Sequence, residues 1–352
     1  MESARPEAAA RPAILVANPS AQSGKAAEWI RRARALLDER GLAHQLLPTE
    51  PGGGTVEKVR AAIDDDAVRL VIYMGGDGTF AEVAKGILAS AHPGAVDMGM
   101  LPTGTANDQG KSFGLVAGPS ALEENVRVIA QGVTTGCDVG ELEIERASKV
   151  IFRERFFDSF SVGLGAASLA TRNRDRERAS RIPGLSMVYR DHLVYAGALL
   201  QRFVESYLID IKFDLDLVLD DRVLHFDSLL DVIIKNTRIF GGEWVFDPEI
   251  QSDDGKFELV PMAGRRDLTA KLVSTFRHSP LTVEDLRSLG ISVADPVAGS
   301  RFELTVRSDG PLPAAQADGE ELPAGERYRV VVRPRALRLI VPRDHVESAA
   351  VD

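Results

Sequence analysis

Apolar and polar residues follow two different patterns along the chain. From residue 12 to residue 138, short apolar runs such as Ala13–Ala17 and Leu70–Met74 are separated by segments in which apolar residues recur at helical spacing. Continuous apolar strands are typical of a sheet that helices cover on both faces. This half therefore predicts an α/β domain with a parallel sheet, and ligands of such domains bind at the carboxyl ends of the strands.

Beyond Asp138 the apolar residues recur at every second position. In the clearest case, Ile209 to Leu219, they alternate with Asp and Lys, and the pair Asp220-Asp221 predicts a turn into a partner strand over about Val223–Ile234. The other strand-like segments are Leu142–Glu145, Phe257–Val260, Phe302–Val306 and Tyr328–Val332, and a helical segment is expected around Leu185–Phe203. The second half therefore predicts a β-rich antiparallel domain.

These patterns predict a disordered tail over residues 1–11, an α/β domain over residues 12–137 and a β-rich domain over residues 138–336. The net charge of −10 argues against nucleic acid as a partner. No apolar run is long enough to cross a bilayer. Cys137 is the only cysteine, which excludes an intramolecular disulfide and fits a cytoplasmic location.

The segment Gly75-Gly76-Asp77-Gly78-Thr79 directly follows the predicted strand Leu70–Met74. Glycines let the backbone approach a ligand closely, and their N–H groups together with those of the next helix form a cradle for anions. Thr79 and Glu82 have capping-box spacing, which predicts a helix start fixed by side chains. Asp77 would repel phosphate unless a cation or a basic partner balances it, so its presence suggests Mg²⁺ or a Lys/Arg neighbour.

Two more polar loops follow neighbouring strands of the predicted sheet. Residues 102–108 read Pro-Thr-Gly-Thr-Ala-Asn-Asp, and Asn18-Pro19-Ser20 follows the first strand. Because adjacent parallel strands end at one edge of the sheet, we expect the three loops to form a nucleotide site. The predicted cofactor-binding residues are Asn18, Gly75, Gly76, Asp77, Gly78, Thr79, Gly104, Thr105 and Asn107.

Together these motifs resemble the diacylglycerol kinase catalytic-domain family, which includes bacterial lipid kinases and the sphingosine and ceramide kinases. The resemblance rests on the three loops above and on Asn236, Gly241-Gly242, Pro248, Asp254-Gly255 and Asp318-Gly319-Glu320, in family order over nearly the whole chain. NAD kinases share the Gly-Gly-Asp-Gly-Thr loop but are not expected to follow it with Pro-Thr-Gly-Thr-Ala-Asn-Asp at this spacing. Three positions depart from the family pattern: Gln109, Glu243 and Glu249.

The resemblance implies an NAD-kinase/diacylglycerol-kinase-like fold that binds ATP in a cleft, with the β-rich domain presenting a lipid. It also implies that the chain returns to complete the first domain, here over residues 337–349. By motif match, Asp318 is the general base and Glu320 belongs to its polar network. Asp77 and Thr79 serve the phosphates and the metal, with Asp77 as the Mg²⁺ ligand.

The family therefore implies an ATP-dependent kinase of a membrane lipid, diacylglycerol or a sphingolipid, that contacts the membrane peripherally. Two alternatives stay open: a kinase of a soluble acceptor such as NAD, and a catalytically silent lipid-binding protein. The basic stretch Arg172–Arg181 fits either a solvated surface or contact with anionic headgroups. The lipid acceptor and the oligomeric state are left open.

Overall fold

The structure is a computed structural model of the chain. It describes residues 13–167, 169, 212–240, 244–245, 250–264, 281–282, 291–293 and 296–345. The chain divides into two compact units. The first contains residues 1–139, 251–254 and 333–352, and the second contains residues 140–250 and 255–332. The sequence analysis had counted residues 138–139, 251–254 and 333–336 with the second domain.

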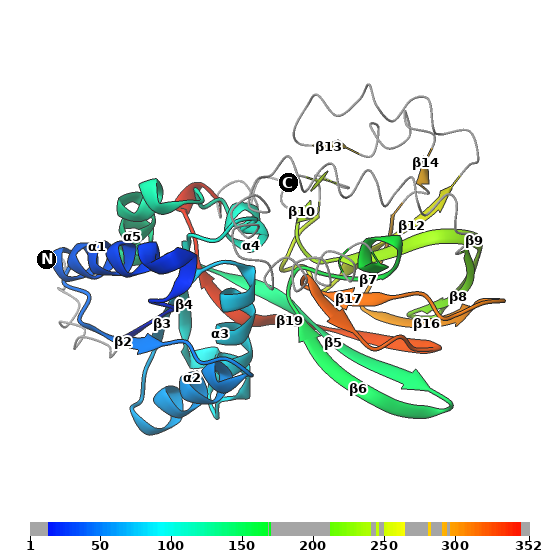
Figure 1. Ribbon diagram of the computed structural model, residues 1–352, viewed down its shortest axis with the longest axis horizontal. Coiled ribbons are helices and arrows are strands. Elements are labelled where there is room, and N and C mark those ends of the chain that lie inside the picture. The colour runs from blue at the N-terminus through cyan, green and yellow to red at the C-terminus, as the bar shows by residue number, and fades with distance from the viewer. Residues whose placement is uncertain are drawn as a thin grey trace, which may run out of the picture. The chain divides into compact units, whose positions relative to one another are not determined.

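The first unit is built on a parallel sheet (Figure 1). Its strand order is β19-β4-β3-β1-β2, and each neighbouring pair is parallel. The strands are β1 (Ala13–Ala17), β2 (His44–Pro48), β3 (Leu70–Gly75), β4 (Asp97–Pro102) and the end of β19 (Arg327–Ile340). The last of these adds to the edge of β4, where Leu339 is the partner of Met98. This sheet confirms the predicted fold class of the first half.

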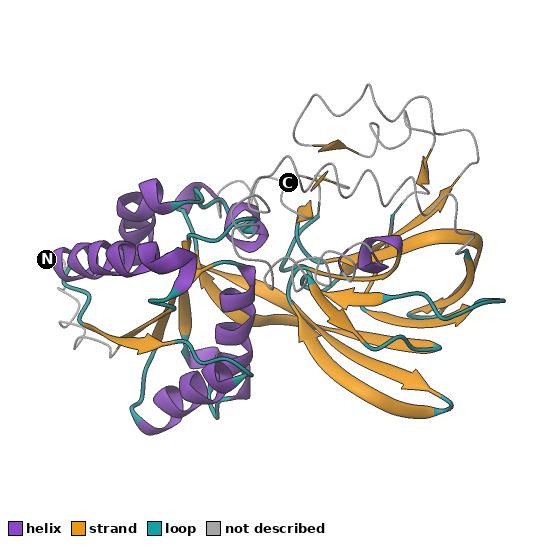
Figure 2. Cartoon of the chain, viewed as in Figure 1, coloured by secondary structure: helices purple, strands orange, loops and turns teal. Residues whose placement is uncertain are grey.

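Helices cover the sheet of the first unit on both faces (Figure 2). They are α1 (Lys25–Glu39), α2 (Gly54–Asp65), α3 (Asp77–Ala89), α4 (Asp108–Ser112) and α5 (Leu122–Gln131), with 3₁₀ turns η1 (Ala21–Gly24), η2 (Pro93–Ala95) and η3 (Pro119–Ala121). Helix α1 packs against α5, and α2 packs against α3. All five residues of β1 are buried, as expected of a strand that is covered on both faces.

The strand order places a topological switch point in this sheet. From β1 the chain moves to β2 on one side, whereas β3 and β4 lie on the other side. Loops that leave β1 and β3 in opposite directions open a crevice at the carboxyl ends of these strands, and this is where open α/β sheets bind their ligands. The topology therefore singles out the loops after β1, β3 and β4.

Apart from the short parallel pair β11 with β13, the described strands of the second unit pair antiparallel, which confirms the predicted fold class of the second half. The longer ones are β5 (Thr134–Arg146), β6 (Lys149–Phe156), β7 (Ser159–Gly163), β8 (Phe213–Leu219), β9 (Arg222–Lys235), β12 (Phe257–Gly264) and β16 (Arg301–Arg307). The short ones are β10 (Ile239–Phe240), β11 (Trp244–Val245), β13 (Leu281–Thr282), β14 (Ile291–Val293), β15 (Val297–Gly299), β17 (Ala315–Ala317) and β18 (Glu320–Leu322). Strands β5 and β19 contribute residues to both units.

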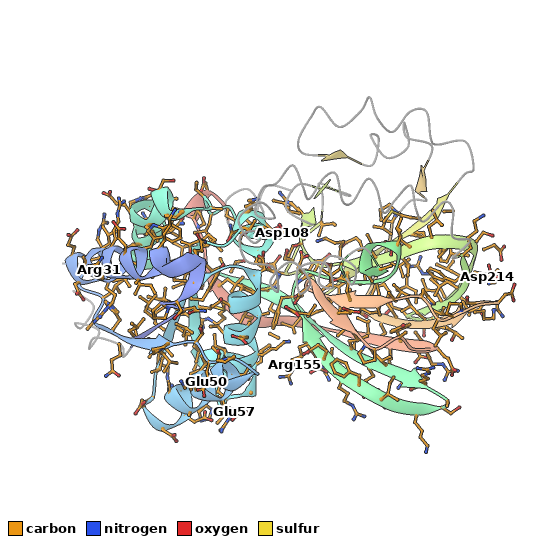
Figure 3. All side chains as sticks on the ribbon, viewed as in Figure 1. Arg31, Glu50, Glu57, Asp108, Arg155 and Asp214 are labelled. Atoms are coloured by element: carbon orange, nitrogen blue, oxygen red, sulfur yellow. The ribbon has the colours of Figure 1, made fainter. Side chains whose placement is uncertain are left out.

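The predicted hairpin around Asp220-Asp221 is present as β8 and β9. Alternate β8 residues such as Leu215 and Leu217 are fully buried. On the other side of β8, Asp216 lies 2.7 Å from both Arg307 and His225, and Asp214 (labelled in Figure 3) accepts the N–H of Ser228. No group of acidic or histidine side chains that could hold a metal occurs among the residues that the structure describes. These aspartates thus form protein contacts on a solvent-facing strand surface.

Several sequence-based expectations concern residues outside those described. They are the tail over residues 1–11, the basic stretch Arg172–Arg181, the helical segment around Leu185–Phe203, and the loop residues 241–243 and 248–249. Within the described ranges, no helix is long and apolar enough to span a membrane. Cys137 is buried, as expected of a small core residue, and its Sγ lies 3.3 Å from the carbonyl oxygen of Asp138.

Candidate active site

The loop after β1 is a compact turn stabilised by its own side chain. The carboxamide oxygen Oδ1 of Asn18 accepts the N–H of Ser20 at 3.0 Å, and the carbonyl of Asn18 accepts the N–H of Ala21 at 3.2 Å. Gln22 then reaches the loop after β4, where its Nε2 donates to the carbonyl of Thr103 at 3.0 Å. Asn18 itself is exposed, at the carboxyl end of its strand. Two of the three predicted loops are therefore joined directly.

The glycine-rich loop after β3 passes straight into helix α3. The helix begins at Asp77 with Gly76 as its N-cap residue, and no side chain caps it. The predicted capping box of Thr79 and Glu82 is therefore wrong, because Thr79 already lies inside the first turn. The sequence pattern placed the N-cap at Thr79, three residues after the observed N-cap Gly76. The early start leaves the first N–H groups of α3 without intrahelical partners and adds them to the predicted anion cradle.

Glycines from the second and third loops are in backbone contact. A Cβ atom on Gly104 would lie 2.3 Å from the Cα of Gly76 and 2.9 Å from its nitrogen. The N–H groups of Thr103 and Gly104 both donate to the carbonyl of Gly75, at 2.8 and 3.0 Å. Only glycine fits at position 104 without moving this backbone. The structure thus brings the loops after β3 and β4 together, as the sequence predicted.

Asn107 organises the turn between β4 and α4. Its Oδ1 accepts the N–H of Gly104 at 2.7 Å, and its Nδ2 donates to the carbonyl of Gly104 at 2.9 Å. Asn107 is buried and has φ of 56°, a left-handed conformation that Asn tolerates better than most residues. In the structure Asn107 holds Gly104 in place. Its predicted contact with nucleotide remains untested.

Asp77 stands at the first position of α3, where its carboxylate also faces the third loop. Its Oδ1 accepts the backbone N–H of Gln109 at 3.2 Å. Asp108, labelled in Figure 3, and Gln109 belong to the short helix α4 and are buried. The side chain of Gln109 therefore lies in the interior, while its backbone supports Asp77. The remaining predicted residues Gly78 and Thr105 are exposed, and Thr79 is half-buried.

In the second unit, Asp318 and Gly319 form the turn between β17 and β18. Their φ angles are 48° and 79°, the left-handed pair of a type I′ hairpin for which Asp-Gly is a favoured sequence. The Asp318 N–H donates to the carbonyl of Ser159 at 2.9 Å, and the Gly319 N–H donates to Oε1 of Gln316 at 2.8 Å. Glu320 is exposed at the first position of β18.

The Asp318 carboxylate accepts three backbone hydrogen bonds from the turn between β6 and β7. Oδ2 accepts the N–H of Phe157 at 2.8 Å, and Oδ1 accepts those of Asp158 and Ser159 at 2.8 and 3.1 Å. Burial and the nearby charge of Asp158 raise the pKa of Asp318 to about 7, although the three N–H groups act in the opposite direction. A carboxylate has about four lone-pair positions, so the contacts with described residues leave one position at Oδ2.

A buried ion pair lies behind this turn, and the sequence analysis did not detect it. Lys235 is fully buried, and its Nζ lies 2.7 Å from Oδ1 of Asp158. Both residues stand in segments that read as ordinary strand ends, Lys235 beside the motif residue Asn236. One signal in the sequence could have indicated this ion pair. Lys235 ends an apolar run and stands next to Asn236, which belongs to the family motifs.

A second buried carboxyl group in this unit also escaped prediction. Asp231 on β9 accepts the N–H of Gly165 at 2.7 Å through Oδ2, and burial raises the pKa of its carboxyl to about 7. Its Oδ1 has no hydrogen-bond partner among the described residues. The apolar run Leu229 to Ile234 predicts a strand, but it does not indicate that the side chain of Asp231 is buried.

Comparison with known proteins extends this picture. Residues 12–142 match the model of the diacylglycerol kinase catalytic domain. The chain is 27% identical over 333 residues to the protein named "Probable lipid kinase YegS-like" of Cronobacter sakazakii, covering 92% of this chain and 95% of that one. It is 25% identical over 325 residues to lipid kinase YegS of Escherichia coli K12, covering 90% and 92%.

A solved diacylglycerol kinase of Bacillus anthracis has a similar fold. The TM-score is 0.63 at 15% identity, and the match covers 95% of this chain and 98% of that one. The whole two-unit architecture is therefore shared, and residues 12–142 carry the matched catalytic domain. Residues 12–142 therefore match a diacylglycerol kinase catalytic domain, and two relatives that span nearly the whole chain are named lipid kinases.

Proposed function

We propose that the chain transfers the γ-phosphoryl group of ATP to a hydroxyl group of a membrane lipid, with diacylglycerol or a sphingolipid as the acceptor. The observation that carries the proposal is the backbone contact between Gly76 and Gly104 at the carboxyl ends of β3 and β4, beside the switch point of a parallel sheet. A side chain on Gly104 would collide with this backbone, so the two loops present main-chain atoms. Such glycine-rich loops ahead of helix N-termini bind phosphate groups.

The N–H groups at the start of α3 and in the loop after β4 are proposed to bind the phosphates of ATP. Asp77 is proposed to hold Mg²⁺, because this ion prefers carboxylate oxygen and is commonly bound by one or two carboxylates together with substrate phosphates. The position of Asp77 fits this role, since the N–H of Gln109 fixes its Oδ1 at the same loop junction. When bound, Mg²⁺ neutralises charge that develops on the phosphates.

Asp318 is proposed to act as the general base. Its carboxylate is held by three N–H groups and retains one lone-pair position, at Oδ2, which can accept the proton of an acceptor hydroxyl. A base works best when its pKa lies near the working pH, and the pKa of Asp318 is about 7. Glu320 is proposed to assist from the same hairpin, where it is exposed.

A lipid acceptor is supported by two relatives that span nearly the whole chain and are named lipid kinases. Phosphorylation of such an acceptor requires contact with a membrane surface, so we propose peripheral membrane association. The first unit is proposed to bind the nucleotide and the second unit the lipid headgroup.

The test is to offer the purified protein a total lipid extract with ATP and Mg²⁺ and to identify phosphorylated products by mass spectrometry. Parallel reactions contain NAD in place of lipid, and a matched reaction uses the Asp77→Ala variant. A phosphorylated diacylglycerol or sphingolipid that is absent with the variant supports the proposal. Phosphorylation of NAD alone would identify a soluble acceptor, and no product with bound lipid would indicate a silent lipid-binding protein.

A further inference from the structure

The turn between β6 and β7 holds Asp318 by its backbone, and a second set of contacts holds the turn itself. The residues concerned are Phe157 and Asp158 of this turn and Ser159, the first residue of β7. Their three N–H groups all donate to the Asp318 carboxylate. The position of the carboxylate therefore depends on whatever fixes these three residues.

Three consecutive residues at the end of β9 fix the turn from its other side. The N–H of Asn236 donates to the carbonyl of Asp158 at 2.9 Å, and its Nδ2 donates to the carbonyl of Phe157 at 2.7 Å. Thr237 donates its hydroxyl to the Asp158 carboxylate. Lys235 completes the set with an ammonium group that is fully buried.

The ammonium group of Lys235 makes contacts that tie it to this place. Nζ lies 2.7 Å from Oδ1 of Asp158 and 2.8 Å from the carbonyl of Ile239, and 3.5 Å from Oγ1 of Thr237. Oδ2 of Asp158 accepts the hydroxyl of Ser159 at 3.0 Å. A buried charge persists only when it is paired and hydrogen-bonded, and here the pairing partner is the central residue of the turn.

We propose that Lys235, acting through Asp158, is a positioning residue for Asp318: it fixes the backbone turn that orients the carboxylate and balances the charge beside it. The inference rests on the proposed function only for its effect on catalysis. The sequence gives Lys235 no chemical role, and the match to the catalytic domain ends at residue 142.

The charged groups around Asp158 determine how the Lys235–Asp158 ion pair affects Asp318. Among the described residues, Asp158 faces Asp318 from the turn, Lys235 faces Asp158 from β9, and Glu258 is the register partner of Lys235 on β12. Glu320 lies exposed on the hairpin of Asp318 itself. With Lys235 charged, Asp158 is balanced. Without it, two carboxyl groups share a buried site and compete for a proton.

The experiment uses two single substitutions with opposite expected effects. Lys235→Met removes the cation, so the titration midpoint of Asp318 should rise by about one pH unit. Asp158→Asn keeps the backbone N–H and removes the anion, so the midpoint should fall by a similar amount. Lys149→Met, the same change at an exposed position of β6, is the matched control and should leave the midpoint unchanged.

Two readouts separate this inference from the proposed function. Carbon-13 NMR follows the Asp318 carboxyl directly in the full chain, assigned by its loss in Asp318→Asn, and the pH profile of kcat follows catalysis. Opposite shifts of the Asp318 resonance support the inference. If the titration midpoint of the Asp318 resonance is unchanged in Asp158→Asn, the inference is wrong, even where Lys235→Met does not fold. The inference is also wrong if the variants lose activity equally at every pH without any shift of the Asp318 midpoint. If the resonance moves and kcat does not follow it, Lys235 still positions Asp318, but Asp318 is not the base.

Discussion

The contact between Gly76 and Gly104 allows a sharp test of the nucleotide-binding loops. In Gly104→Ala the new methyl group would lie 2.3 Å from the Cα of Gly76, about 1 Å closer than ordinary van der Waals contact. No flexible side chain can yield, because both nearest atoms belong to backbone. The φ angle of Gly104 is not in the left-handed region, so the whole effect is steric. The loops after β3 and β4 must therefore move apart.

The magnitude follows from this displacement. A shift of about 1 Å breaks or lengthens the hydrogen bonds from Thr103 and Gly104 to the carbonyl of Gly75. Overpacking of this kind destabilises a protein by about 1–3 kcal/mol. Misplacing a binding group by about 1 Å can lower the rate by about 10²-fold. We expect kcat/KM for ATP to fall by about two orders of magnitude while the melting temperature falls by several degrees.

The assay is steady-state phosphorylation of lipid vesicles at varied ATP, with thermal unfolding measured on the same preparations. Gly94→Ala is the matched control, because its methyl group would meet nothing within 4 Å and its φ is not left-handed. It should retain both ATP kinetics and stability. If Gly104→Ala bound ATP as well as Gly94→Ala does, the two loops would not form the phosphate site, and the argument from backbone contact would be wrong.

Three further predictions concern the two carboxyl groups whose pKa is raised to about 7, those of Asp318 and Asp231. Asp318→Asn should lower kcat by about 10²–10⁴-fold with an unchanged KM for ATP, because the amide cannot accept the proton; near-normal turnover would move the base elsewhere, with Glu320 tested next. In the wild type, kcat should fall about tenfold per pH unit below about pH 7, since protonated Asp318 is inactive and its pKa is about 7; a profile that is flat between pH 5 and 7 would contradict this assignment. Asp231→Asn should raise the free energy of unfolding at pH 8 by up to about 4 kcal/mol and leave it unchanged at pH 4. The reason is that the raised pKa of Asp231 favours folding at low pH, and this contribution is lost as pH rises through about 7. Denaturant unfolding at the two pH values checks the prediction.

The α/β half of the fold was predictable because its strands are recognisable from their apolar sequence pattern. Ala13–Ala17 and Leu70–Met74 are continuous apolar runs. Such runs are typical of strands in a sheet that helices cover on both faces. The start of α3 was not predictable to the residue. Glycine can cap a helix without any side-chain signal, so the Thr79-Glu82 spacing matched a motif that the backbone did not use.

The buried charges of the second unit could not be predicted for a different reason. Strand periodicity tells which residues share a face, but Lys235 and Asp158 are 77 residues apart, and only the pairing of β7 with β9 brings them together. Asp231 illustrates the same limit, because it sits in an apolar run and its partner Gly165 is 66 residues away. Long-range strand pairing is the information that the sequence pattern lacks.

Asp318 shows why a common structural motif and a chemical role need not compete. Asp-Gly is a frequent hairpin turn, and the structure contains that turn, with both residues in left-handed conformations. Here the neighbouring strand pairing, Ala317 with Phe160, carries the turn to the three N–H groups that receive the carboxylate. The hairpin turn thus orients the Asp318 carboxylate, and the β6–β7 turn holds it by hydrogen bonds. Burial raises the pKa of Asp318 towards neutrality. An ordinary hairpin therefore supplies the geometry that would allow Asp318 to act as a base.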